Sequence, residues 1–315
     1  MTTRRASLFL ALALPFLGIG IPTSFSQEDS TAEEAGADEI VFMGYNLKNY
    51  LKMKRRVDGD SVENAPKPER EVEGIVTMIL KGKPDAVGLV EIGTMDEVQD
   101  LQRRLKAKGL DLPHSEIIRA YDDVRRIALI SKFPIVATDH QSELGYLLGE
   151  QRFQFRRGIF DATIQVNPDY QLRVLGVHLK SKRPVEEADQ SLMRRNEAHL
   201  LRKHTEAIMK AAPETNLIVF GDFNDTRNEI PIKAIQGKYG TAGYLKDIQA
   251  KDDLGYKWTY CWSYADQYSR FDFLFVNKPL VKEVDRDRSF IVADPVWFTA
   301  SDHRPVVTTI VAKDQ

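Results

Sequence analysis

Residues 217–225 read LIVFGDFND, and this stretch decides how the rest of the chain is interpreted. The run from Leu217 to Phe220 is apolar and short enough for a buried strand. Gly221 then allows a sharp turn or a close approach of the backbone to a ligand. An acid, an amide and a second acid follow, so the stretch predicts polar chemistry at the mouth of a sheet. The alternative is a simple turn, because Asp and Asn form local backbone hydrogen bonds.

The N-terminus has the features of a secretory signal. Arg4 and Arg5 form a positive end, residues 6–21 are almost wholly apolar, and small residues precede position 27. The apolar run contains Pro15 and is shorter than the roughly 20 residues that cross a bilayer; an uncleaved anchor is the alternative. The expected division is a signal peptide over residues 1–26, a flexible leader over 27–38 and one domain over 39–315. We therefore expect a secreted or periplasmic protein without stable membrane insertion.

The composition limits the partners of the chain. It has 44 basic and 46 acidic residues, for a formal net charge of −2. Loss of Arg4 and Arg5 with the signal would leave 42 basic residues against 46 acidic ones, a charge of −4. This balance is not that of a generally basic nucleic-acid-binding protein, although a local basic patch is compatible with it. The single cysteine, Cys261, cannot form an internal disulfide, so the exported chain must rely on its core.

Hydrophobic patterns predict many strands with few helices between them. The predicted helices cover residues 69–80, 95–108, 190–211 and 230–236. The predicted strands cover residues 39–45, 86–90, 127–130, 135–138, 158–166, 172–177, 217–220, 258–262, 271–276 and 305–311. Residues 48–68 are predicted to form a long loop. This order favours two packed sheets with helices outside over a regularly alternating parallel sheet.

Polar side chains that can bind a ligand stand at the ends of several predicted strands. They are Asn46, Glu91, His178, Asp222 with Asn224, and Asp302 with His303. Asp272 lies inside an apolar strand, where a charged side chain is costly unless it is paired. Each residue has an ordinary alternative, such as a turn residue, a helix cap or a buried histidine. Their joint occurrence indicates one site, because independent turns have no reason to give these residue types in this order.

In these stretches the chain resembles the endonuclease/exonuclease/phosphatase superfamily of deoxyribonuclease-like, metal-dependent phosphoesterases. The resemblance covers residues 39–311. The matching stretches are Tyr45-Asn46-Leu47, Leu89-Val90-Glu91, Ile127 to Pro134, Val177 to Ser181, Gly221 to Asn224, Arg270 to Phe273 and Ser301 to Pro305. The resemblance implies an α/β fold, a four-layered sandwich of two mixed β-sheets flanked by helices. It also implies a site where the loops of the two sheets meet.

The chain departs from the family pattern in three places. Val90 stands where many members have Gln, and Arg126 stands where Gly is common. His178 opens a His-Leu-Lys-Ser stretch where members that cut DNA at abasic sites have an Asn-containing motif. This last difference and the predicted signal peptide argue against abasic-site repair.

Hydrolysis of a phosphodiester requires neutralised phosphate charge, an activated water and in-line geometry. Hard oxygen ligands suit Mg²⁺ or Mn²⁺, so Glu91 and Asn46 are the expected metal ligands. Asp302 is expected to support the metal or its waters. Asp222 and His303 are the candidates for activating water, because an imidazole beside a carboxylate can accept a proton near neutral pH.

The resemblance assigns the remaining roles. Asp272 should hold His303, while Asp222 should either orient the water or act as the base. Asn224 should hydrogen-bond the nucleophile or the phosphate. His178 should donate to a phosphoryl oxygen and stabilise charge that develops in the transition state.

Basic residues in nearby loops are expected to form a local cationic rim that holds the substrate. The candidates are Lys180, Arg126 and Arg157; ordinary solvated charges are the alternative. We expect a monomeric, secreted phosphodiesterase, a nuclease of low sequence specificity with nucleic acid as its substrate. The alternatives are a phospholipid or small-molecule phosphoesterase and an inactive binding protein. Residues 256–268 are rich in aromatics, as in membrane-acting members, but their alternation predicts a half-buried strand.

Overall fold

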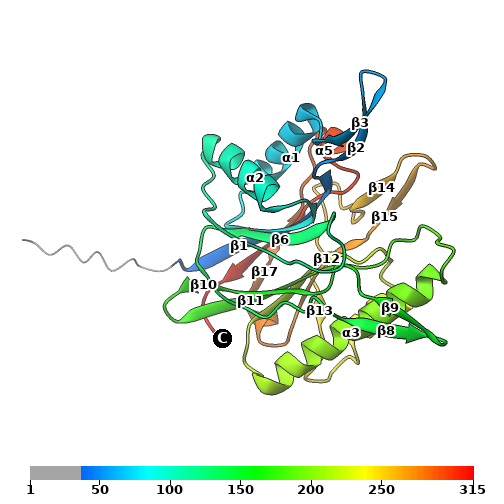
Figure 1. The fold of residues 1–315 in the computed structure, drawn as a ribbon. Coiled ribbons are helices and arrows are strands. Elements are labelled where there is room, and N and C mark those ends of the chain that lie inside the picture. The colour runs from blue at the N-terminus through cyan, green and yellow to red at the C-terminus, as the bar shows by residue number, and fades with distance from the viewer. Residues whose placement is uncertain (1–36) are drawn as a thin grey trace, which may run out of the picture. The chain divides into compact units, whose positions relative to one another are not determined.

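The computed structural model describes residues 37–315, so the predicted signal peptide and all but two residues of the predicted leader lie outside the described residues. Two six-stranded mixed sheets pack face to face, and helices cover their outer faces (Figure 1). The predicted α/β four-layered sandwich is therefore confirmed. None of the helices in residues 37–315 combines the length and apolar character that crossing a membrane requires.

Each sheet has one parallel strand pair in its middle, and all its other neighbours are antiparallel. The first sheet contains, in spatial order, β17 (Val284–Ile291), β18 (Val306–Val311), β1 (Glu39–Tyr50), β4 (Ala86–Ile92), β6 (Arg126–Ser131) and β5 (His114–Ile117). The second contains β13 (Lys246–Asp247), β16 (Asp272–Val276), β12 (Leu217–Asp222), β11 (Tyr170–His178), β10 (Phe160–Asn167) and β7 (Ile135–Thr138). The parallel pairs are β1 with β4 and β11 with β12.

Three hydrophobic cores fill the three interfaces between the four layers. The core between the sheets includes Phe42 of β1 and Phe220 of β12, whose rings meet edge to face at 5.5 Å. A second core lies under α1 (Glu69–Gly82), α2 (Met95–Ala107) and α5 (Trp297–Ala300). The third lies under α3 (Gln190–Ala211) and α4 (Ile230–Gln236). The two sheets are thus fixed on both faces, which gives their strand ends rigid positions.

The structure contains all the predicted helices and most of the predicted strands, and it adds elements that were not predicted, among them β5, β17 and α5. Residues 48–68 were predicted as a loop, which is wrong: β2 (Met53–Val57) and β3 (Asp60–Ala65) pair as a hairpin. Almost all of its side chains contact solvent, so the apolar alternation that identifies a strand is missing. The predicted strand over 258–262 is reduced to β14 (Tyr260–Trp262), which pairs with β15 (Gln267–Ser269) in a separate hairpin. The hairpin of β8 (Gly145–Leu148) and β9 (Gln151–Gln154) was not predicted.

Candidate active site

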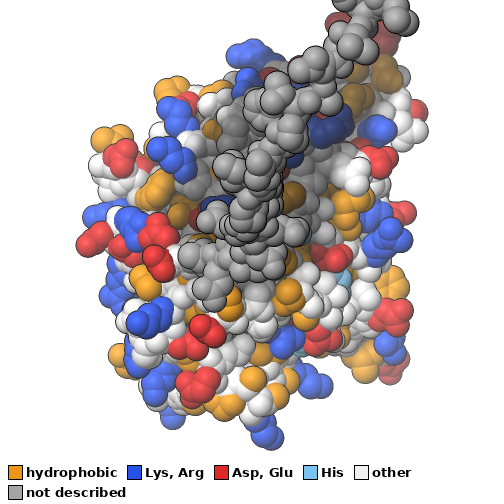
Figure 2. Space-filling view, turned by 90° about the vertical axis from the view of Figure 1, so that its left-hand side faces the viewer, with side chains coloured by type: hydrophobic (Ala, Val, Ile, Leu, Met, Phe, Trp, Pro, Cys, Tyr) orange, Lys and Arg blue, Asp and Glu red, His pale blue; other side chains and the backbone are white. Residues whose placement is uncertain are grey.

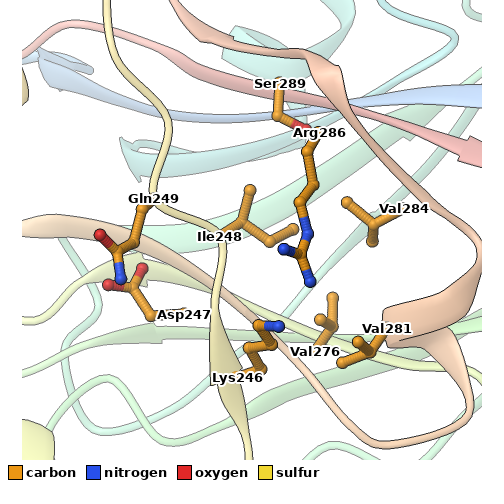
Figure 3. Close-up of a pocket in the computed structure, with 9 residues that line it drawn as sticks. All are labelled: Lys246, Asp247, Ile248, Gln249, Val276, Val281, Val284, Arg286 and Ser289. Atoms are coloured by element: carbon orange, nitrogen blue, oxygen red, sulfur yellow. The ribbon is translucent and has the colours of Figure 1, made fainter.

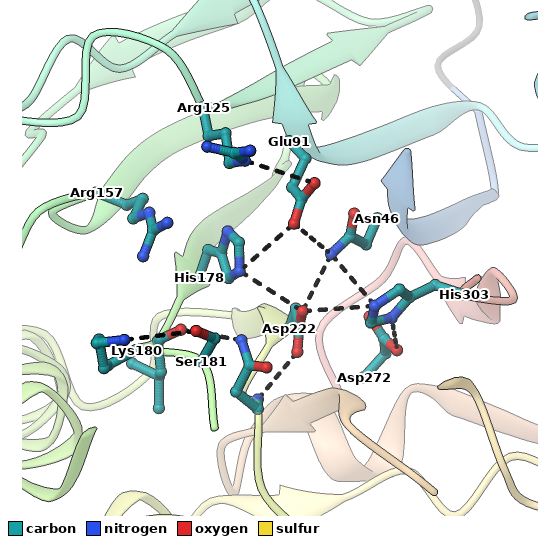
Figure 4. Close-up of polar contacts among 12 residues, drawn as sticks. Asn46, Glu91, Arg125, Arg157, His178, Lys180, Ser181, Asp222, Asp272 and His303 are labelled. Carbon is teal, nitrogen blue, oxygen red and sulfur yellow. Dashed lines mark hydrogen bonds and ion pairs between the residues drawn. The ribbon is translucent and has the colours of Figure 1, made fainter. Parts of the chain in front are cut away.

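The carboxyl ends of the two parallel pairs carry four of the predicted site residues. Asn46 and Glu91 lie in β1 and β4 of the first sheet, and His178 and Asp222 end β11 and β12 of the second. His178 and Asp222 are direct register partners. Parallel strands present their carboxyl ends at the same edge of a sheet, where open α/β sheets place their ligands. Figure 4 shows that the two sets of side chains face each other across the sandwich.

Glu91 interrupts the regular geometry of β4. Its φ of 63° lies in the left-handed region, and the pairing of β4 with both neighbouring strands shifts register there. A bulge of this kind redirects a side chain, and a left-handed non-glycine residue costs on the order of 1–3 kcal/mol. The redirected carboxylate accepts a hydrogen bond from the Asn49 backbone over 3.0 Å. Backbone strain is therefore concentrated where Glu91 meets the end of β1.

Gly221 is required by the close approach of β12 to β11. Its φ is 152°, and a Cβ atom at this position would lie 2.0 Å from the carbonyl oxygen of Val177. The glycine therefore allows Asp222 to pair beside His178 at the strand end. Beyond it, the Asn224 backbone donates to Asp222 Oδ1 over 2.9 Å, which fixes the carboxylate.

The side-chain amide of Asn46 lies at the centre of the polar network. Its Nδ2 donates to Asp222 Oδ2 over 3.0 Å and lies 3.5 Å from both Glu91 Oε1 and His303 Nε2. His178 Nε2 lies 3.6 Å from the same Asp222 oxygen and 3.8 Å from Glu91 Oε1. Five side chains that are far apart in the sequence therefore meet around one point.

His303 is held from the other side by Asp272. Its Nδ1 lies 2.7 Å from Asp272 Oδ2, and its Nε2 faces Asp222 Oδ2 at 3.7 Å. Burial alone would lower the pKa of His303, but the charges of Asp272 and Asp222 and the hydrogen bond to Asp272 raise it to about 10. The imidazole therefore carries a proton at neutral pH when no cation is bound.

Asp222 and His178 have pKa values shifted in the directions that favour their neutral forms. Burial raises the pKa of Asp222 to about 7; the charge of His303 opposes the rise, and the charge of Asp272 adds to it. Burial, followed by the positive charge of Arg157, holds the pKa of His178 well below its ordinary value. His178 Nδ1 is buried without a hydrogen-bond partner among the described residues. The centre thus contains a carboxyl that titrates near neutrality, as proton transfer requires.

Asn224 and Asp302 adjoin this network. Asn224 donates its Nδ2 to the Leu179 carbonyl over 3.0 Å, which ties together the loops after β12 and β11. Asp302 makes no side-chain hydrogen bond among the described residues, and its negative charge contributes to the raised pKa of His303. Both residues therefore border the centre, and their predicted roles stay predictions.

The predicted cationic rim has a different composition from the one expected. Arg126 donates to the Gly93 carbonyl over 2.9 Å and so supports the turn after β4. Its neighbour Arg125, not Arg126, approaches the acids, with Nε 3.9 Å from Glu91 Oε2. Arg125 lies in the turn before β6, where its backbone N–H donates to Asp122 Oδ1 over 2.9 Å, whereas Arg126 is the first residue of the strand. On the other side of His178 lie Arg157 and Lys180 (Figure 4).

Sequence reasoning missed two hydroxyl groups that position the site. Ser301 is fully buried; its Oγ donates to the Asn46 carbonyl over 2.8 Å and accepts from the His303 backbone over 3.1 Å. Thr259 Oγ1 accepts from the backbone N–H groups of Phe271 and Asp272. Small hydroxyl residues have no characteristic spacing, so no pattern in the sequence distinguishes these two from turn residues.

The residues present fit a divalent cation bound through oxygen. Among residues 37–315, the only Lys or Arg nitrogen within 4.0 Å of the carboxylates of Glu91 or Asp222 is Arg125 Nε, at 3.9 Å from Glu91. Three carboxylates, Glu91, Asp222 and Asp272, thus face one charged imidazole, His303, and this distant arginine. Hard oxygen donors of this type bind Mg²⁺ or Mn²⁺, and the Glu91 carboxylate would hold the ion. The side-chain oxygen of Asn46 accepts from the Lys48 backbone over 3.0 Å, so it would reach the ion only after the amide turns over.

Within residues 37–315, two groups of two aspartates and one histidine have ligand atoms that lie within 4.8 Å of one another. We call Asp222, Asp272 and His303 the site cluster, and Asp139, Asp161 and His204 the arginine-bound cluster. In the second, Arg173 Nε donates to Asp161 Oδ1 over 2.8 Å and Arg173 Nη2 donates to Asp139 Oδ2 over 3.2 Å. The arginine therefore already occupies the place that a cation would take.

A further pocket of about 280 Å³ lies between the edges of the two sheets, at β13 and β17. Figure 3 shows Lys246 and Arg286 reaching into it from opposite walls, with Val276 and Val284 beside them. None of its lining residues belongs to the network around Asn46.

Comparisons with known proteins show which family the chain belongs to. The model of the Endonuclease/Exonuclease/phosphatase family matches residues 57–303. A comparison with curated proteins found no significant match. Among solved structures, truncated TDP2 from Caenorhabditis elegans aligns with a TM-score of 0.55 at 16% identity, over 87% of this chain and 98% of that one.

Two further solved structures give the same result. The human Nocturnin catalytic domain with bound sulfate has a TM-score of 0.58 at 18% identity, over 88% of this chain and 95% of that one. A Bacteroides vulgatus endonuclease/exonuclease/phosphatase has a TM-score of 0.57 at 15% identity, over 87% and 99%. At these identities the structures support the fold, while the family match covers most of the sequence. The chain belongs to the Endonuclease/Exonuclease/phosphatase family of metal-dependent phosphoester hydrolases.

Proposed function

We propose that this protein is an exported phosphodiesterase that uses Mg²⁺ or Mn²⁺ and cleaves nucleic acid with low sequence specificity. The observation that carries the proposal is the convergence of Asn46, Glu91, Asp222 and His303 around one point, where three carboxylates including Asp272 face one charged imidazole. When bound, the cation polarises a phosphoryl oxygen and neutralises charge.

The protein side chains divide the remaining work. Asp222 accepts a proton from the attacking water, since it lies at the centre of the network and its pKa is raised by burial. His303, kept protonated by Asp272, stabilises the negative charge of the phosphoryl group. His178 is neutral, and its Nε2 faces the centre, so it donates a hydrogen bond to a phosphoryl oxygen. Asn224 and Asp302 complete the border of the site.

A panel of substrates tests the proposal. The purified chain is incubated with plasmid DNA, RNA and bis(p-nitrophenyl) phosphate in the presence of Mg²⁺ or Mn²⁺, and again with EDTA. We expect turnover with metal, none with EDTA and none in an Asp222→Asn variant that remains folded. Absence of turnover of all three substrates with either metal would contradict the proposed function.

Export and a monomeric state are proposed from the sequence. Residues 1–26 combine two arginines, an apolar run and a small-residue end, as a cleavable signal does. Fractionation of cells that express the full chain, with N-terminal sequencing of the product, tests this. A product that keeps residue 4 and stays in the cytosol would contradict export. Light scattering of the purified product tests the monomer.

A phospholipid head group is the second candidate substrate, and one surface feature favours it. Aromatic side chains of the β14–β15 hairpin project into solvent, with Trp262 49%, Tyr264 94% and Tyr268 56% exposed. The predicted alternation is present in residues 258–262, where Thr259 and Cys261 are buried, but the rest of the hairpin is exposed. Exposed aromatics of this kind can enter a membrane interface. Binding to sphingomyelin vesicles with release of phosphocholine separates this candidate from the nuclease.

A further inference from the structure

A basic pocket of about 420 Å³ lies next to the centre, on the side of His178. It is formed by the β8–β9 hairpin, the turn that follows it, the loop after β11 and the first turns of α3. Four of its lining side chains are cations: Arg152, Arg156, Arg157 and Lys180. We call this the flanking pocket.

The flanking pocket is joined to the centre through Arg157 and Lys180. Figure 4 shows both side chains beside His178, on the side away from Asp272 and His303. The charge of Arg157 contributes to the lowered pKa values of both His178 and Lys180. A ligand that filled the flanking pocket would therefore continue directly into the site.

The cations of the flanking pocket are poorly balanced by the protein. Arg152 and Arg156 make no ion pair or side-chain hydrogen bond among residues 37–315, and Lys180 Nζ contacts only Ser181 Oγ and the Arg183 carbonyl. Only Arg157 has a carboxylate partner, with its Nε 2.9 Å from Asp122 Oδ2.

Two carboxyl groups line the flanking pocket as well. Glu187 is exposed, and Glu197 is buried with its pKa raised to about 7 by burial. Charges of both signs are interspersed on the face in Figure 2, whereas the lining of the flanking pocket is predominantly positive. An anionic group would therefore be stabilised there.

Tyr121 and Phe153 add aromatic surface to the flanking pocket, and Tyr121 is 50% exposed. Cations beside aromatic rings are the combination with which proteins hold single nucleotides, through the phosphate and through stacking of the base. A volume of about 420 Å³ is within the range of small-ligand sites. A zwitterionic phospholipid has one phosphate, which the centre itself would occupy, and it offers no second anion to these arginines.

We propose that the flanking pocket binds the nucleotide adjacent to the scissile bond, so that the enzyme acts on nucleic acid chains and recognises a second phosphate. This inference rests on the proposed phosphodiesterase function and extends it by assigning a second phosphate-binding subsite. Arg152, Arg156 and the two inner cations hold the second phosphate, and the aromatic side chains contact its base.

Dinucleotides with and without a terminal phosphate test the inference. The substrates are TpT, which has only the scissile phosphate, and pTpT and TpTp, which add a phosphate on one side or the other. We expect the native enzyme to cleave one of the two extended substrates with a kcat/KM about tenfold or more above that for TpT. In an Arg152→Ala, Arg156→Ala variant this preference should disappear, while kcat/KM for TpT stays unchanged.

A charge-matched control removes two exposed lysines from the outer face of α3, Lys203→Ala with Lys210→Ala. This variant should keep the preference of the native enzyme. An equal loss on all three dinucleotides in the arginine variant, or an unchanged preference, would overturn the inference.

A binding measurement tests the flanking pocket if the protein has no phosphodiesterase activity. If the native enzyme cleaves no dinucleotide and no bis(p-nitrophenyl) phosphate, binding of a fluorescein-labelled oligothymidylate in EDTA decides the inference independently. A loss of affinity of about tenfold or more in the arginine variant would support the flanking pocket. Unchanged affinity, or hydrolysis of sphingomyelin vesicles without any oligothymidylate binding, would overturn it.

Discussion

The site cluster and the arginine-bound cluster contain the same residue types but differ in how their charge is balanced. Both bring two aspartates and one histidine within 4.8 Å. Arg173, a permanent cation, donates to both acids of the arginine-bound cluster, whereas the acids of the site cluster face the titratable imidazole of His303. Through Asn46 the site cluster also adjoins a third carboxylate, Glu91. Residue types alone therefore do not define a reaction centre, because the two clusters differ in the partner that their acids have.

The largest expected effect comes from the site cluster. Asp222→Asn should lower kcat/KM for bis(p-nitrophenyl) phosphate by about 10²–10⁴-fold, because the variant cannot accept the proton of water. His303→Ala should have an effect of similar size. Steady-state kinetics with saturating metal measures both, and circular dichroism shows that each variant is folded.

The matched variant in the other cluster is His204→Ala, which removes a histidine 2.7 Å from Asp161. Its kcat/KM should stay within about twofold of the native value, since nothing in the arginine-bound cluster touches the centre. A loss in His204→Ala as large as in His303→Ala would show that the comparison does not separate catalysis from stability.

The second prediction is that replacing one aspartate by asparagine changes the free energy of unfolding in opposite directions in the two clusters. Asp161→Asn leaves Arg173 without its main partner, and we expect a loss of about 3 kcal/mol in the free energy of unfolding. Asp222→Asn removes a carboxylate whose pKa is raised by burial. Above pH 7 the variant should therefore have a higher free energy of unfolding than the native protein. Urea unfolding in EDTA at pH 8 measures both. A lower free energy of unfolding in both variants would show that the buried carboxylate of Asp222 stabilises the fold as that of Asp161 does.

Glu197 is a buried acid that lies outside both clusters. It accepts the Lys180 backbone N–H over 2.6 Å, and burial raises its pKa from 4.5 to about 7. Between these pH values the folded chain binds more protons than the unfolded chain, so stability falls as pH rises through this window. The shift corresponds to about 3 kcal/mol at pH 8.

Glu197→Gln removes this titration and keeps an acceptor for Lys180. We expect the variant to match the native protein near pH 4.5 and to exceed its stability at pH 8 by up to about 3 kcal/mol. Thermal unfolding in EDTA across this range is the measurement. A difference between variant and native protein that does not change with pH would show that Glu197 is ionised throughout.

The smallest expected effect is at Arg125, the one arginine of the described residues that lies within 4.0 Å of Glu91 or Asp222. Its Nε lies 3.9 Å from Glu91 Oε2, a distance at which a partly exposed ion pair contributes about 0.2–1 kcal/mol. Arg125→Gln should therefore strengthen Mn²⁺ binding about two- to fivefold, because a competing positive charge is removed. Isothermal titration measures the change, and weaker binding would indicate that Arg125 supports the geometry of Glu91.

Much of the architecture could be predicted because its signals are local. Residues 190–211 and 230–236 form helices with the predicted bounds, and the polar residues at strand ends do meet. The β2–β3 hairpin could not be predicted, because a strand that is exposed on both faces lacks apolar alternation. The roles of the individual site residues stay predictions until variants are measured.

The finer parts of the site depend on contacts between distant segments. The left-handed conformation of Glu91 and the bridge that Ser301 makes from β1 to His303 leave no pattern in the sequence. The difference between the two clusters also depends on packing, because Arg173 reaches Asp161 only across the β10–β11 pairing. Sequence therefore indicated which residues could react, and the packing determines which partners their acids have.

We propose that the acids at the strand ends hold one divalent cation through Glu91. Titration of Mn²⁺ into the metal-free protein, followed by the electron paramagnetic resonance signal of free Mn²⁺, tests it most directly. We expect one Mn²⁺ site that Glu91→Gln abolishes and that Asp139→Asn, in the arginine-bound cluster, leaves intact. Retention of the site in Glu91→Gln, or its loss in Asp139→Asn, would show that the cation does not bind at the strand ends.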